Sequence, residues 1–228
     1  YHDAIGDYST NEPTMDGTAS LTYALSALQQ EGMRQVGRTA DKNVYVEGGI
    51  IRTDPSRKQL TLVFTAADKA DGAEAIIKTL RKEKIQGAFF FTGEFFERFP
   101  EVVKQLIAEG HYVGSHSYGH LLYMPWENRD SLLVSQAEFE TDLRKSYAQL
   151  ASFGIPYQAA PYFIPPYEYY NRTVADWAKG LGLQIINFTP GTLSNADYTT
   201  PDMGEKYRSS QVIYDRILTV EAKEDLND

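Results

Sequence analysis

The last three quarters of the chain alternate short apolar runs with longer segments in which apolar residues recur every three or four positions. The short runs predict buried strands, and the longer pattern predicts helices with one apolar face. Residues 73–84 are typical, because Ala73, Ile76, Ile77 and Leu80 share one helical face. The predicted strands are 60–65, 88–92, 112–115, 159–163 and 184–188, and the predicted helices are 73–84, 100–109, 135–153, 173–179 and 209–222.

Five successive strand-then-helix units imply parallel strands joined by crossover helices. We therefore expect an α/β fold, with a (β/α) barrel of fewer than eight strands favoured and a flat doubly wound sheet as the alternative. In both architectures the reactive groups lie at the carboxyl ends of the strands. Asp68, His116, His120 and Tyr167 each follow a predicted strand, so we expect them at the same end.

The first 57 residues have a different pattern. Residues 15–36 predict one helix, with Leu21, Leu25 and Leu28 at helical spacing. Residues 37–57 contain glycines, a proline and scattered charges, which favour a linker with a short strand near residues 44–46.

Composition narrows the classes of function. The net charge is −9 without a cluster of Lys and Arg, which argues against binding to nucleic acid. No run of 18 apolar residues is present, so no membrane-spanning helix is predicted. The chain has no cysteine, which excludes disulfides and a thiolate metal site and suits an extracellular or periplasmic location.

Residues 114–120 read GSHSYGH and place two of the four histidines four positions apart, directly after a predicted strand. Imidazole suits zinc, nickel or cobalt, and a helical turn beyond His116 would point both rings the same way. A hydrolytic zinc site needs three protein ligands and an open position, and Asp68 is the candidate third ligand. Two surface histidines without a metal remain the alternative.

The chain from residue 58 to its end resembles the polysaccharide deacetylases of carbohydrate esterase family four. Residues 61–68 (TLVFTAAD) are similar to the family's first motif, and residues 88–93 (AFFFTG) to its second strand. The segment GHYVGSHSYGH at residues 110–120 is similar to its metal-binding motif. Residues 163–167 (FIPPY) resemble the third motif, with Tyr167 in the tyrosine position.

The resemblance implies a distorted (β/α) barrel that removes acetyl groups, N- or O-linked, from a polysaccharide. It implies a divalent metal, with Zn²⁺ favoured, held by His116, His120 and Asp68. Asp68 and Tyr167 would be the catalytic residues, with Asp68 as the base for water and the backbone N–H of Tyr167 holding the oxyanion. The expected substrate-binding residues are Pro166, Tyr167, Glu168 and Trp126, although packing alone is an equal interpretation of the aromatic ones.

Three departures from the family pattern favour an alternative. Thr65 and Ala66 occupy the positions of the two adjacent aspartates in the first motif, and the arginine of the third motif is absent. No histidine follows His120, so the barrel is expected to be incomplete at its C-terminal end. The alternative is a carbohydrate-binding module on the same fold with impaired catalysis.

Residues 1–36 resemble the C-terminal signature of glycoside hydrolase family 9, with Glu12 in the position of that family's general acid and Thr18 where an asparagine is expected. A helix cap at Asn11 or Thr14 is the alternative interpretation, and the remnant is favoured. The resemblance implies a remnant of a helical barrel over residues 1–36, a linker at 37–57 and a deacetylase-like domain at 58–228. It favours an acetylated plant cell-wall glycan as substrate, with a fragment of a bifunctional glycosidase–deacetylase as a further alternative.

Overall fold

The computed structural model describes residues 41–57 and 59–223. One compact unit begins at Asn43 and holds the strands and helices that follow. The predicted helix at residues 15–36 and the segment that resembles glycoside hydrolase family 9 lie outside the described residues, so both stay predictions.

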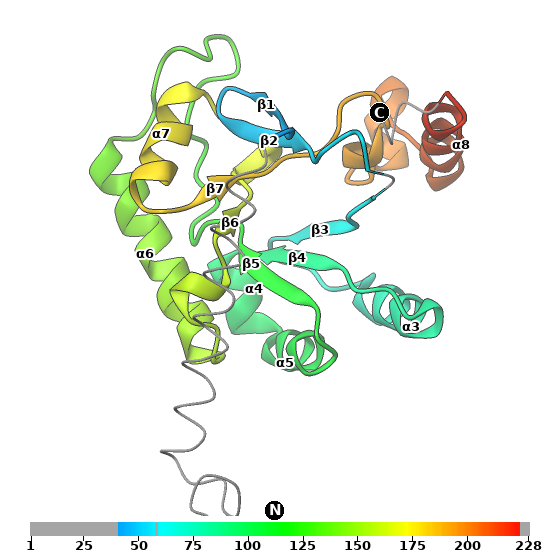
Figure 1. The fold of residues 1–228 in the computed structure, drawn as a ribbon, viewed down its shortest axis with the longest axis horizontal. Helices are drawn as coiled ribbons and strands as arrows, with labels where there is room; N and C mark the ends of the chain where they lie inside the picture. Colours follow the sequence, from blue (N-terminus) through cyan, green and yellow to red (C-terminus); the bar gives the residue numbers. More distant parts are fainter. Residues whose placement is uncertain (1–40, 58, 224–228) are drawn as a thin grey trace, which may run out of the picture. The chain divides into compact units, whose positions relative to one another are not determined.

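A parallel five-stranded sheet forms the centre of this unit (Figure 1). The strands neighbour one another in the order in which they follow along the chain, which is the arrangement that repeated strand–helix units produce. This confirms the predicted α/β class with a parallel sheet. The strands are β3 (Val63–Ala66), β4 (Ala88–Phe91), β5 (Tyr112–Ser115), β6 (Tyr162–Phe163) and β7 (Gln184–Ile185).

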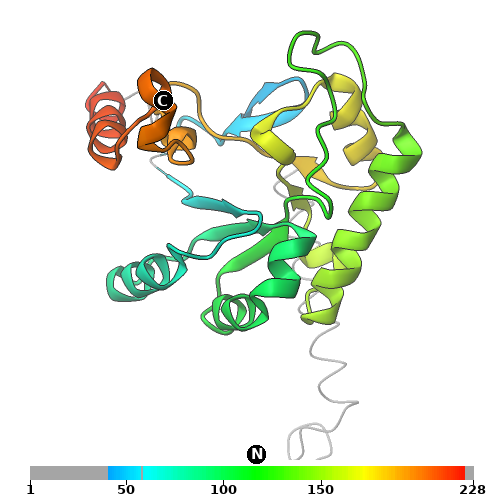
Figure 2. The same cartoon turned by 180° about the vertical axis from the view of Figure 1, so that it is seen from behind.

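The helices between successive strands lie in an arc along one side of the sheet, as Figures 1 and 2 show from opposite directions, and α8 lies apart from this arc. The prediction missed the short helix α4, which begins where the Thr92 hydroxyl accepts a hydrogen bond from the backbone N–H of Phe95. The long helix α6 starts at a capping box formed by Ser135 and Glu138. The helices are α3 (Ala73–Glu83), α4 (Gly93–Arg98), α5 (Pro100–Ala108), α6 (Gln136–Ser152), α7 (Arg172–Gly180) and α8 (Ser210–Glu221).

The apolar core lies between the sheet and these helices. All four residues of β4 are buried, as a central parallel strand requires. Phe89 and Phe91 belong to the main cluster together with Leu106 of α5 and Phe139 of α6. This packing fixes β4 and β5, and therefore fixes the residues that follow β5.

Part of the segment predicted to be a linker belongs to the fold. β1 (Val44–Val46) and β2 (Gly49–Arg52) form an antiparallel hairpin. The hairpin reaches the far edge of the sheet, where the N–H of Asn187 donates to the carbonyl of Ile50 at 2.8 Å. A side chain at position 49 would collide with the Tyr170 ring, so only glycine fits there.

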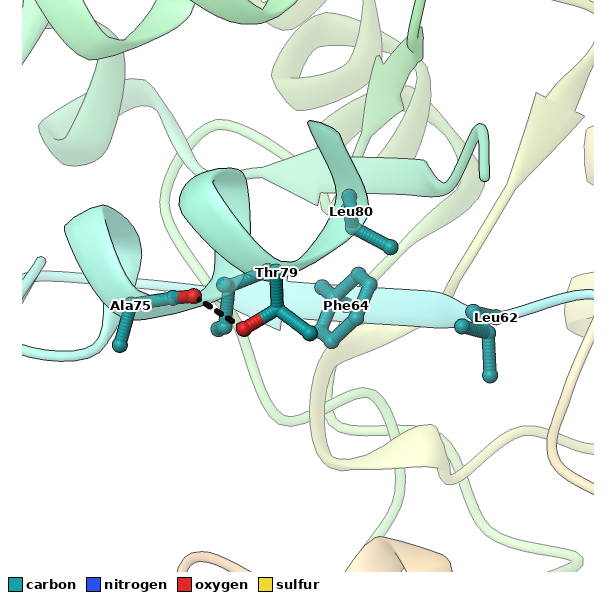
Figure 3. A pocket seen from close by; sticks show the side chains of 6 residues that line it. Leu62, Phe64, Ala75, Thr79 and Leu80 are labelled. Atoms are coloured by element: carbon teal, nitrogen blue, oxygen red, sulfur yellow. Dashed lines mark hydrogen bonds between the residues drawn. The ribbon is translucent and has the colours of Figure 1, made fainter. Parts of the chain in front are cut away.

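Strand β3 was predicted to be buried, and the structure corrects this. It is an edge strand that pairs only with β4 among the described strands, so Val63 is 41% exposed. Beside it, the side chains of β3 and α3 line an open apolar hollow of about 320 Å³ (Figure 3). The described strands do not close into a barrel, and closure therefore stays a prediction. The lining residues are Leu62, Phe64, Ala75, Ile76, Thr79 and Leu80.

Within residues 41–57 and 59–223, no helix combines the length and the apolar character that crossing a bilayer requires.

Candidate functional site

His116 follows the last residue of β5 and is 3% exposed. Its Nδ1 lies 2.9 Å from the carbonyl oxygen of Ile164, next to β6. A carbonyl only accepts, so Nδ1 carries the proton and Nε2 keeps its lone pair. Burial, and then the neighbouring His120, lower the pKa of His116 to about 3. The ring is therefore neutral and ready to act as a ligand throughout the neutral pH range.

The ring of His120 points toward that of His116, with the two Nε2 atoms 3.2 Å apart. Burial also lowers the pKa of His120, and the charges of Asp142 and Asp68 oppose that shift. Two nitrogens bound to one tetrahedral zinc at about 2.0–2.1 Å would be separated by about 3.3 Å. The spacing of the pair therefore fits two corners of a tetrahedral metal site, and metal binding by both histidines stays a prediction.

The backbone between the two histidines is not the helical turn that we expected. Residues 116–120 form bends, with Ser117 at φ 68° and His120 at φ 51°, both in the left-handed region. The Ser117 hydroxyl accepts a hydrogen bond from the N–H of His120 at 2.9 Å. The loop reaches the same convergence of rings by a sharper path, at the cost of two residues in a sparsely populated conformation.

Asp142 of α6 holds this loop in place, and the sequence analysis missed it. Its two carboxylate oxygens accept from the N–H of Tyr118 at 2.9 Å and of Gly119 at 2.7 Å. The carboxylate is 7% exposed, and a Cβ at position 119 would lie 3.0 Å from it. An acidic residue next to Phe139 and Leu143 on the apolar side of a helix was the available signal.

One helical turn later, Ser146 makes a second connection between α6 and the loop. Its hydroxyl lies 2.8 Å from that of Ser115, which in turn accepts from the N–H of Ser117 at 3.0 Å. Both serine side chains are fully buried. Helix α6 thus shapes the histidine loop through two buried polar contacts, and such outer contacts orient the ligands of metal sites.

Asp68 lies in a bend two residues beyond β3 and is exposed. Its charge reaches His120 and acts to raise the pKa of that histidine. Among the described residues, however, no three side chains of the His, Cys, Asp and Glu types converge closely enough to hold a metal ion. Asp68 as third ligand and as catalytic base therefore stays a prediction.

The segment after β6 lies next to the histidines and contains three of the predicted substrate-binding residues. Tyr167 and Glu168 lie at φ 60° and 51° in a short 3-10 turn that begins at the buried Pro166. The Tyr167 ring lies 4.5 Å from the His120 ring, between centroids. Burial, and then Asp197, raise the pKa of Glu168 to about 7. Trp126 packs edge-on against Tyr167 at 5.5 Å, so the structure brings these two predicted residues together.

The fold and the site together define an α/β protein with a two-histidine cluster at the carboxyl end of a parallel sheet. The sequence profile of the polysaccharide deacetylase family matches residues 52–186, and the chain belongs to this family.

Two curated relatives carry related names. The chain is 25% identical to a peptidoglycan-N-acetylglucosamine deacetylase of Bacillus cereus over 167 residues, which are 69% of this chain and 56% of that protein. It is 26% identical to the peptidoglycan-N-acetylglucosamine deacetylase PgdA of Listeria monocytogenes over 163 residues, which are 72% of this chain and 30% of that protein. The chain thus spans only part of the length of these relatives.

A solved structure of a carbohydrate esterase family 4 pseudoenzyme from Bacillus anthracis has the same fold. It superimposes with a TM-score of 0.60 at 21% sequence identity and covers 77% of this chain and 55% of that one. At this level of identity the likeness concerns the fold.

Proposed function

We propose that this protein is a metal-dependent hydrolase that removes acetyl groups from a glycan. The observation that carries the proposal is the 3.2 Å approach of the His116 and His120 Nε2 atoms at the carboxyl end of the sheet, where the Nε2 of His116 carries no proton. Membership of the polysaccharide deacetylase family supports it.

A divalent cation held by His116 and His120, for which we favour Zn²⁺, would supply Lewis acidity and lower the pKa of a bound water. We propose Asp68 as the third ligand or as the base that accepts the proton of the attacking water, because its charge reaches His120. The backbone N–H of Tyr167 is the proposed donor to the oxyanion. The chain would thereby convert an acetylated sugar and water into acetate and the free sugar.

The N-acetyl amide of an amino sugar is the preferred substrate bond, because the relatives from Bacillus and Listeria carry that chemistry in their names. An acetylated plant cell-wall glycan was expected from residues 1–36, and it stays a second candidate. Either polymer is met outside the cytoplasm, so we propose an extracellular or periplasmic location.

The test is release of acetate from N-acetylglucosamine oligomers, peptidoglycan and acetylated xylan, with and without added Zn²⁺ or Co²⁺. We expect metal-dependent release from the amino-sugar polymers. A chelator should abolish it, and the variant Glu140→Gln on the outer part of α6 should behave like wild type. No release from any polymer in the metal-loaded protein would refute the hydrolase.

A carbohydrate-binding protein without catalysis is the second candidate. Thr65 and Ala66 favour it, since they end β3 where the family pattern has aspartates. This candidate predicts that glycan oligomers and a metal bind while no acetate appears. The two candidates therefore differ in one measurement on the same sample.

A further inference from the structure

The end of β4 lies between the two parts of the proposed site. β4 pairs with β3 on one side and with β5 on the other, so the residues that follow it neighbour both the bend that contains Asp68 and the loop that contains the histidines. Thr92 and Gly93 come directly after β4, and Thr92 is 2% exposed. Because every residue of β4 is buried, this junction has a fixed base.

Thr92 holds the bend that contains Asp68. Asp68 lies two residues beyond β3, so the pairing of the strands does not fix its position. The Thr92 hydroxyl donates to the carbonyl of Ala67 at 2.6 Å, while the same oxygen accepts from the N–H of Phe95 at 3.3 Å. Within residues 41–57 and 59–223, this is the only hydrogen bond that reaches residues 67–69. The direction in which the bend leaves the sheet therefore depends on one hydroxyl group.

The next residue, Gly93, holds the histidine loop. Its N–H donates to the carbonyl of Tyr118 at 3.0 Å, and Tyr118 is midway between His116 and His120 in the sequence. A Cβ at position 93 would collide with the Tyr118 ring, so only glycine allows this close approach. Two consecutive residues are thus bonded to the two parts of the proposed site, one to each.

We propose that Thr92 is a positioning residue, whose hydroxyl sets the Asp68 carboxylate against the histidine pair. Outer contacts of this kind orient the ligands of metal sites, and a misplacement of about 1 Å can lower a catalytic rate by about 100-fold. The inference rests on the proposed function for the role of Asp68. The order of the bend itself does not depend on any activity, and it can be measured in the metal-free protein.

NMR relaxation of the metal-free protein tests the hydrogen bond directly. Thr92→Val keeps the shape of the side chain without its hydroxyl, so the backbone order parameters of residues 67–69 should fall from about 0.85 toward about 0.6. Thr92→Ser keeps the hydroxyl and should stay near wild type. Ser209→Ala removes the equivalent cap from α8, away from the bend, and is the control for the loss of a helix cap. Unchanged order in Thr92→Val would overturn the proposal.

A double-mutant cycle separates positioning from a general loss of stability. Thr92→Val should lower acetate release by about tenfold or more, and Thr92→Ser should restore most of it. In the Asp68→Asn background, Thr92→Val should lower the remaining activity by less than about twofold, because the carboxylate that it positions is already gone. Equal losses in both backgrounds would show a merely structural role. A wild-type protein that releases no acetate would reject the hydrolase, and the order parameters would still decide whether Thr92 holds Asp68 in place.

Discussion

The ends of β5 and β3 both supply proposed metal ligands, yet their environments are opposite. After β5, His116 is almost fully buried. The loop around it is held by hydrogen bonds that involve Asp142, Ser115 and Ser146. After β3, Asp68 lies exposed in a bend, on an edge strand with an open apolar hollow beside it. The difference teaches that the histidine half of the site is built into the core, while the carboxylate half depends on a loosely supported strand end.

The largest expected effect comes from the histidine pair. His116→Ala combined with His120→Ala removes both imidazoles, so high-affinity binding of one zinc-like ion should be lost completely. Metal content after dialysis and calorimetric titration with Zn²⁺ measure this. Retention of the same stoichiometry in the double variant would place the metal elsewhere.

Substitution of Asp68 should change the activity of the protein but not its stability. Asp68→Asn should lower acetate release by about 100-fold if Asp68 is the base, within the range of about 10²–10⁴ typical of such groups. Because Asp68 is exposed, the free energy of unfolding should change by less than about 0.5 kcal/mol.

Asp71→Asn, a nearby exposed carboxylate, is the matched control for this comparison. Acetate assays and urea unfolding of both variants suffice. An Asp68→Asn protein with wild-type activity would mean that this side chain only favours the start of α3.

Asp142, which supports the loop of the two histidines, should affect the affinity for the metal. Asp142→Asn leaves one of the N–H groups of Tyr118 and Gly119 without an acceptor, so the loop loses its fixed shape. Zn²⁺ affinity should fall about 10- to 100-fold, and the free energy of unfolding should fall by about 1–3 kcal/mol. Glu140→Gln makes the same change of charge on α6 without touching the loop, and equal losses in both variants would contradict the positioning role.

The smallest effect concerns Glu168, in the turn after β6. Its pKa is raised to about 7 by burial and by Asp197, so its protonated form favours folding. That contribution is complete below about pH 4.5 and is lost as the pH rises through about 7. Glu168→Gln should therefore stabilise the protein at pH 8 by about 1 kcal/mol, a figure reduced for solvent screening, and by little at pH 4. Urea unfolding at both pH values measures this, and an equal effect at both would exclude the titration.

Periodicity alone predicted those elements that lie deep in the fold. β5 and α6 agree with the prediction because an apolar run and a helical stripe each reflect burial against a neighbour. β3 was misjudged, since the same apolar run occurs in an edge strand whose exposure depends on what pairs with it. The 159–163 strand shortened to Tyr162–Phe163 because residues 157–159 form a 3-10 turn.

The site was predictable to the extent that its chemistry lies in one short segment. His116 and His120 could be identified from their spacing and from the strand before them. Asp142 could not be found by motif, because its role depends on a contact across 23 residues with backbone groups that any sequence would carry. The contact between Trp126 and Tyr167 likewise joins two loops that only the fold brings together.

In the loop between β5 and α6, the N–H of Leu133 donates to the carbonyl of Tyr123 at 2.8 Å, and this hydrogen bond has a consequence for how this protein can diversify. It ties the base of the loop that carries Trp126, so residues between the two ends can lengthen, shorten or change without pulling on α6 or on the histidines. Under the proposed function, recognition of the polymer and the chemistry at the metal would rest on separately adjustable parts, so that a new glycan preference could arise without rebuilding the reaction centre.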